Sequence, residues 1–293
     1  MRIRVMSFIA AVGVVAGCSN PIDDKVNYLV ADVPPPPAGA CSKCLKVGNW
    51  YRFSELGVKD IGGAGPALVS ALNGAWKQDI GKKELNIFWR VESISADGVI
   101  VKAVSGARTG TGDSSGWCLL DKSTAEIKAP FTADGQLGAS AKTSMQVYAG
   151  SEPSPKNCAP TLPVHAIPVT EIEITSNCSG TCDPASADTI TGTIKGGLAK
   201  AVIPSICTCV ILDDRYSDSC GVPDGVWKDP DDKCNGCGPP GAVNYINLGT
   251  LITSFNGGQD INYDCKAADG GPAACLDADF TAERIETAPE PCK

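Results

Sequence analysis

Residues 85–105 read LNIFWRVESISADGVIVKAVS and hold two mainly apolar runs, Leu85–Ser95 and Val99–Ser105, joined by Ala96-Asp97-Gly98. In Leu85–Ser95 apolar and polar side chains alternate at most positions, which is the pattern of a strand buried on one face. Asp-Gly is favoured in the short turns that join neighbouring antiparallel strands, because glycine tolerates a positive φ. This stretch therefore predicts a β-hairpin.

Further short runs on both sides of the hairpin predict more strands. The cleanest is Glu171-Ile172-Glu173-Ile174-Thr175, in which apolar and polar residues alternate without interruption. The strands expected in addition to the hairpin are Trp117–Leu120, Glu126–Ala129, Met145–Tyr148, Val169–Thr175 and Thr189–Lys195.

Three segments favour helix. Pro66–Ile80 has apolar residues at helical spacing, a proline suited to the first turn, and Gly81 to end it. Gly197–Ile203 predicts a short helix, and Val243–Phe255 predicts a longer one that ends at Gly257. The expected fold class is α+β: a mainly antiparallel, sandwich-like β framework with about three short helices and many disulfides.

The first eighteen residues have the three-part plan of an export signal. Arg2 and Arg4 are followed by a mostly apolar run from Val5 to Ala16, which is too short to span a bilayer comfortably. Val15-Ala16-Gly17-Cys18 resembles the lipobox of bacterial lipoproteins. The resemblance implies cleavage before Cys18, acylation of that cysteine, and a bilayer as the chain's partner. Because Ser19 rather than Asp follows the cysteine, it also implies the outer membrane of a Gram-negative cell.

The number of cysteines supports this interpretation. The chain has fifteen, and an odd number in an exported protein leaves one thiol to explain. With Cys18 acylated, the others can all pair as structural disulfides in an oxidising compartment. The disulfide candidates are Cys41, Cys44, Cys118, Cys158, Cys178, Cys182, Cys207, Cys209, Cys220, Cys234, Cys237, Cys265, Cys275 and Cys292.

Three regions follow from these features. Residues 1–17 form the signal peptide, and residues 18–40 form a lipidated tether made semi-rigid by four consecutive prolines, Pro34 to Pro37. Residues 41–293 form the disulfide-stapled body. The proline-containing segment near residues 151–160 offers a subdomain boundary, although one continuous body is favoured.

Charge excludes some partners. Loss of Arg2 and Arg4 with the signal takes the formal net charge from −8 to −10. An acidic body without basic clusters argues against nucleic acid as a partner.

Few residues point to catalysis or to metal. Cys41-Ser42-Lys43-Cys44 and Cys234-Asn235-Gly236-Cys237 have redox or metal-ligand spacing, but neither has a thioredoxin-like context, so structural disulfides are favoured over a thiol-redox or metal-binding role. His165 is the single histidine, which excludes the usual multi-histidine metal sites. The run containing Asp229, Asp231 and Asp232 offers calcium ligands, but Lys233 breaks the calcium-loop pattern. We expect no cofactor.

Among the tryptophans, Trp76 and Trp89 fall on apolar faces and are expected in the core, whereas Trp50-Tyr51 and Trp227 are candidate ligand contacts. The leading hypothesis is a non-enzymatic envelope lipoprotein with a structural, adhesive or ligand-binding role toward an unidentified protein or glycan. The alternatives are an anchored extracellular hydrolase that uses paired carboxylates, and a thiol-redox or metal-binding envelope protein.

Overall fold

The computed structural model of the chain describes residues 2–4, 40–81, 83, 85–108, 116–120, 124–148, 166–180, 188–205, 207–211 and 243–292. Within these ranges β-strands predominate. The strands of the main sheet are β2 (Trp50–Ile61), β3 (Asn86–Ile94), β4 (Gly98–Arg108), β5 (Trp117–Leu119), β6 (Ala125–Pro130), β7 (Thr143–Tyr148), β8 (Ala166–Ser179), β9 (Thr189–Ala199), β12 (Cys265–Lys266), β13 (Pro272–Ile285) and β14 (Glu290–Pro291). The helical elements are α1 (Cys41–Cys44), α2 (Pro66–Gly81), the 3₁₀ helix η2 (Lys200–Ser205) and α3 (Leu248–Phe255).

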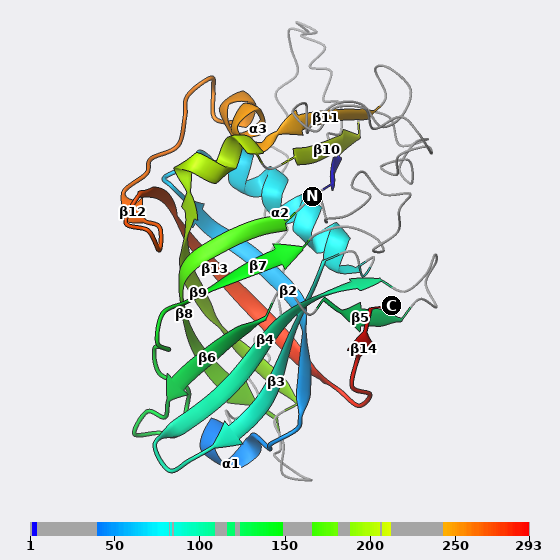
Figure 1. The fold of residues 1–293 in the computed structure, drawn as a ribbon, viewed down its shortest axis with the longest axis vertical. Helices are drawn as coiled ribbons and strands as arrows, with labels where there is room; N and C mark the ends of the chain where they lie inside the picture. The colour runs from blue at the N-terminus through cyan, green and yellow to red at the C-terminus, as the bar shows by residue number, and fades with distance from the viewer. Residues whose placement is uncertain are drawn as a thin grey trace, which may run out of the picture.

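The strands run in the order β14-β5-β4-β3-β2-β13-β9-β8-β7, with β6 paired to β4 and β12 paired to β13. All of these pairs are antiparallel except β14 with β5. The predicted hairpin is confirmed as β3 and β4, in which Ile94 pairs with Val99. A sandwich of two sheets is not confirmed, because the long strands all belong to one strongly curved sheet (Figure 1).

The sheet curls until its two sides are joined by the chain between β6 and β7. The Ala141 N–H donates to the Lys128 carbonyl of β6 at 2.8 Å, and the Leu137 N–H donates to the Ser176 carbonyl of β8 at 3.0 Å. Residues 137–141 therefore lie between β6 and β8. Irregular pairing along β2, β8 and β13 accompanies the strong curvature, as bulges increase local twist and bending. We call the structure formed in this way the curled sheet, and the space that it encloses its interior.

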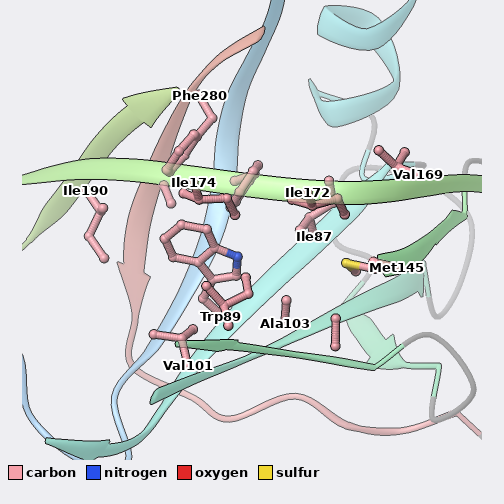
Figure 2. Packing of buried hydrophobic residues seen from close by; sticks show 14 of the residues in the cluster. Ile87, Trp89, Val101, Ala103, Met145, Val169, Ile172, Ile174, Ile190 and Phe280 are labelled. Carbon is pink, nitrogen blue, oxygen red and sulfur yellow. The ribbon is translucent and has the colours of Figure 1, made fainter. Parts of the chain in front are cut away.

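Alternation along the strands fills this interior with apolar side chains. In β6 the residues Ala125, Ile127 and Ala129 are buried, whereas the residues between them are exposed. Figure 2 shows the Trp89 indole in the middle of the interior, with Phe280 and Ile174 on one side and Val101 on the other. A smaller apolar cluster lies apart from this core and contains Phe88, Val104 and Leu119, packed against Trp50, Trp117 and Ile285.

The helix predictions had mixed outcomes. α2 occupies Pro66–Gly81, as expected. The helix expected over Gly197–Ile203 was wrong at its start, because β9 continues to Ala199 and is followed by η2. The helix expected over Val243–Phe255 was also wrong in its first part. Residues 243–247 form β11, which pairs with β10 (Cys207–Ile211), and only Leu248–Phe255 are helical.

Two central strands, β2 and β13, were not expected from the sequence. β13 pairs with β2 on one side and β9 on the other, so it lies in the middle of the sheet. Its residues include four alanines and three acidic side chains, a composition of low β-propensity. The strand is favoured here by pairing on both edges and by the small size of its inward side chains, as at Ala278 and Ala282, which are buried.

A small second sheet contains β1 (Arg2–Arg4), β10 and β11. β1 falls within the predicted signal peptide, so the predicted mature chain would retain only β10 and β11 of this sheet. Residues 18–39 of the predicted tether and the segment near residues 151–160 lie outside the described residues. β7 and β8, which flank that segment, pair with each other in the main sheet.

Candidate binding cavity

Three aromatic rings form the rigid part of the interior. The Phe53 and Phe280 rings are stacked with their centroids 4.7 Å apart. Trp89 meets both rings edge-on, at 5.3 Å from Phe53 and 5.0 Å from Phe280. Edge-to-face and offset-stacked contacts of this kind are the favoured geometries of aromatic pairs, so the group holds the β2, β3 and β13 walls together.

The other part of the interior is not completely filled. A cavity of about 100 Å³ lies among mainly aliphatic side chains. Ala103 of β4 pairs directly with Ala125 of β6, and both alanines line the cavity, so two small side chains lie side by side in its wall. The lining residues are Phe53, Leu56, Ile61, Leu72, Trp76, Leu85, Ile87, Trp89, Ala103, Ala125, Ile127, Thr143, Met145, Val147, Ile167, Val169, Ile172, Ile174, Ile194, Leu198, Leu248, Ile252, Leu276 and Ala278.

The chemistry of this lining is uniformly apolar. Among the described residues that line it, Thr143 contributes the only polar side-chain group apart from the indole N–H groups of Trp76 and Trp89. No acidic or basic side chain in the described part of the chain lines the cavity. An apolar cavity of this kind stays dry, because water needs several polar partners to enter it. The arrangement can therefore hold an uncharged apolar molecule.

Helix α2 covers the interior where the strands diverge. β3 pairs with β2 only along Trp50–Arg52, and α2 packs against β2 beyond that point. Leu72 and Trp76 of α2 line the cavity from this side, together with Leu248 and Ile252 of α3. Figure 1 shows α2 lying across this end of the curled sheet, close to α3.

Asn73 fixes the middle of α2 to β2. Its side-chain amide accepts a hydrogen bond from the Val58 N–H at 2.6 Å and donates one to the Val58 carbonyl at 2.9 Å. The side chain thus replaces the strand partner that β2 lacks at this point, because an amide side chain offers the same donor and acceptor as a peptide group.

We expect Asn73→Ala to lower the free energy of unfolding by about 1–3 kcal/mol, because both backbone groups of the buried Val58 lose their partner. Urea unfolding monitored by tryptophan fluorescence measures this loss. Lys77→Ala, an exposed change on the same helix, is the matched control and is expected to change stability by less than about 0.5 kcal/mol. Equal stability of the two variants would contradict the role given to Asn73.

Polar side chains also fix both ends of α2. At its start, the Gly65 N–H donates to Asn256 Oδ1 at 2.9 Å. At its end, Arg52 donates from Nη2 to the Ile80 carbonyl at 2.7 Å and from Nε to Asn86 Oδ1 at 2.9 Å. Burial lowers the pKa of Arg52 from its ordinary value, although an arginine stays charged near neutral pH. The helix is therefore held at both ends and in the middle.

Comparison with known protein families, with curated proteins and with solved structures finds no match for this chain. No helix in the described ranges is both long and apolar enough to cross a membrane. The function proposed below therefore follows from the chain's own residues.

The disulfides lie outside the cavity and staple the sheet. Cys41 of α1 is bonded to Cys178 of β8, Cys118 of β5 to Cys292, and Cys265 of β12 to Cys275 of β13. Cys44 is also disulfide-bonded. Because Cys41 is bonded to Cys178, the first C-x-x-C pair does not close on itself, and a thioredoxin-like use of that motif has no support.

The structure separates the aromatic candidates. Trp89 is buried in the core, as expected, and Trp76 is half-buried against it. The prediction that Tyr51 contacts a ligand was wrong, because its side chain is fully buried. This burial raises the pKa of its phenol. Trp50 remains partly exposed beside an open pocket.

Several predicted residues lie outside the described residues or have undescribed side chains. Those outside are Cys18, Cys158, Cys182, Cys220, Cys234, Cys237, His165, Trp227, Asp229, Asp231 and Asp232, and the side chains of Cys207 and Cys209 are likewise not described. Within the described part of the chain, no cluster of three or more His, Cys, Asp or Glu side chains is placed to hold a metal ion.

Proposed function

We propose that this chain is an exported lipoprotein, anchored to the outer membrane through an acylated Cys18, whose curled sheet binds a small uncharged apolar molecule. The observation that carries the ligand-binding part is the apolar cavity of about 100 Å³ in the interior. The cavity supports a binding protein over the alternative of a hydrolase, because none of the described residues that line it carries a carboxylate.

The loss of stability that an empty cavity causes supports a ligand-binding role for it. At about 24 cal/mol for each Å³ of void, a cavity of about 100 Å³ lowers the free energy of unfolding by about 2 kcal/mol if it stays empty. An apolar ligand would recover much of that free energy by restoring contacts with the aliphatic walls. Met145, whose side chain is flexible and polarisable, lets the wall adapt to the shape of the occupant.

The anchor is supported by independent features of the sequence. The lipobox-like Val15-Ala16-Gly17-Cys18 provides the acylation site, and lipidation of Cys18 leaves an even number of cysteines in the body. The disulfides in the described residues fit an oxidising compartment outside the cytosol.

An NMR titration of the mature chain with benzene, and separately with n-hexane, tests the cavity. We expect saturable shifts of methyl signals from lining residues such as Ile87, Ile172 and Met145, whereas methyl signals of Val47, on the exposed surface, stay in place. If neither probe shifts the lining methyl signals, the binding proposal is wrong.

Larger side chains in the cavity wall should weaken the binding of benzene and n-hexane. Ala103→Leu and the smaller change Ala125→Val each add carbon atoms to the cavity wall, so we expect weaker probe binding in both variants. Lys102→Leu adds an apolar side chain to the exposed face of the same strand as Ala103 and serves as the control with unchanged binding. Retention of wild-type affinity in both cavity variants would place the probe elsewhere.

Mass spectrometry of the protein isolated from membranes tests the anchor separately. We expect a mature N-terminus at Cys18 that carries acyl chains, and loss of acylation in Cys18→Ser. A protein that keeps residues 1–17, or a mature chain without lipid, would contradict the anchor and leave the cavity proposal intact.

A further inference from the structure

A second hollow lies where β2 begins and β13 ends. It has a volume of about 490 Å³ and is lined by polar and charged side chains, in contrast to the apolar cavity. Its lining residues are Gly48, Asn49, Trp50, Arg90, Arg284, Ile285, Glu286 and Ala288. We call it the Trp50 pocket.

The pairing of the strands places its central residues in one row. Trp50 of β2 is paired with Arg90 of β3 on one side and with Ile285 of β13 on the other. The Arg90 guanidinium lies over the Trp50 ring, 5.8 Å from its centroid. The Trp50 side chain thus has the Arg90 guanidinium over its ring, packs against the Phe88 cluster and stays partly exposed.

Planar polar groups surround the Trp50 indole. Arg90, Arg284, Asn49 and Glu286 each present two or more polar atoms in a fixed plane, which suits bidentate hydrogen bonding. The Asn49 side chain lies in the pocket wall next to the Tyr51 phenol, and its hydrogen bond to that phenol opposes the rise in the phenol's pKa that burial causes. The pocket thus combines one apolar surface, the Trp50 indole, with hydrogen-bond donors and hydrogen-bond acceptors.

The charges argue against a simple anion as the ligand. Arg90 Nη1 lies 3.3 Å from Glu92 Oε1, and Arg284 Nε lies 3.9 Å from Asp188 Oδ1. Glu286 contributes a further carboxylate to the lining. Because both guanidinium groups already have an acidic neighbour, the pocket carries no excess of positive charge to attract an anion.

We propose that the Trp50 pocket binds an uncharged saccharide. A pyranose ring has an apolar C–H face that can cover an indole, and its rim carries adjacent hydroxyls that both donate and accept hydrogen bonds. Arginine, asparagine and glutamate side chains can each engage two neighbouring hydroxyls at once. This site is distinct from the apolar cavity, and the proposal does not depend on the cavity's being occupied.

An NMR titration of the mature chain tests the proposal with three soluble probes: glucose, N-acetylglucosamine and the β-linked tetramer of N-acetylglucosamine. We expect at least one of them to shift the Trp50 indole N–H signal saturably and to leave that of Trp89 unchanged. If none shifts the Trp50 signal at millimolar concentration, the proposal is overturned. Acetate, tested in parallel, is expected not to bind, and binding of acetate alone would show an anion site instead.

Two variants sharpen the test. Trp50→Ala should weaken saccharide binding at least tenfold, because it removes the indole surface. Arg90→Lys keeps the charge but loses the planar pair of donors, so we expect a similar weakening for a saccharide and little change for an anion. Lys77→Ala, an exposed change on α2 outside the pocket lining, is the control. Undiminished saccharide binding in both pocket variants, each shown to be folded by its methyl spectrum, would contradict the assignment.

Discussion

A Cys41→Ala/Cys178→Ala double variant is expected to lose about 5 kcal/mol of unfolding free energy. The bond closes a loop of 137 residues, and the chain-entropy relation assigns about 5 kcal/mol to a loop of that length. It ties α1 to β8 beside the segment that joins the two sides of the curled sheet. Gln136, in that segment, accepts the Cys178 N–H through Oε1 at 2.9 Å.

The bond between Cys265 and Cys275 supplies the matched control. It closes a loop of only 10 residues, so the same relation gives about 3 kcal/mol for Cys265→Ala/Cys275→Ala. Denaturant unfolding of the two double variants under identical conditions gives the comparison. A loss from the Cys41 and Cys178 variant no larger than that from the control would contradict its role as the staple between α1 and β8.

Trp89→Ala should be the most damaging single substitution in the interior, with an expected loss of about 3–5 kcal/mol. The indole is nearly fully buried and contacts both Phe53 and Phe280 edge-on, so its removal enlarges the existing void and separates the stacked pair from the β3 wall. Thermal or urea unfolding measures the loss. The enlarged cavity should also bind n-hexane more tightly than the wild-type cavity does.

Trp117→Ala is the control for this prediction. Trp117 is half-buried in the smaller cluster outside the interior, where its ring contacts Phe88 and the Arg52 guanidinium. We expect a smaller loss than for Trp89→Ala, because less apolar surface returns to water. An equal loss of unfolding free energy from the two variants would contradict the prediction that Trp89 stabilises the fold more than Trp117 does.

The sequence predicted those helices and strands whose conformation is determined by turn residues, helix-start residues and the spacing of nearby apolar residues. The β3–β4 hairpin follows from Asp97-Gly98, and α2 follows from Pro66 and its spaced apolar residues. β13 was missed because alanines and acidic residues carry little strand signal, and its conformation depends on pairing with β2 and β9. Residues 243–247 fit a helical period equally well, but pairing with β10 holds them as a strand.

The candidate sites were less predictable than the elements. The apolar character of Ile87, Trp89 and Ala103 was visible in the sequence, but the void depends on Ala103 lying opposite Ala125 once the sheet curls. Trp50 was predicted as a candidate ligand contact from its polar surroundings, and it lines a pocket. Its partners Arg90 and Arg284 could not be identified, because they come from strands far apart in the chain.

The most direct test of the apolar cavity is diffraction from crystals of the mature chain held under xenon pressure. Xenon is an uncharged apolar atom that enters dry cavities of this size class. We predict a strong density peak among Ala103, Ala125 and Met145, and its loss in Ala103→Leu. Wild-type crystals without xenon in the interior would contradict the central claim that the curled sheet encloses an apolar binding cavity.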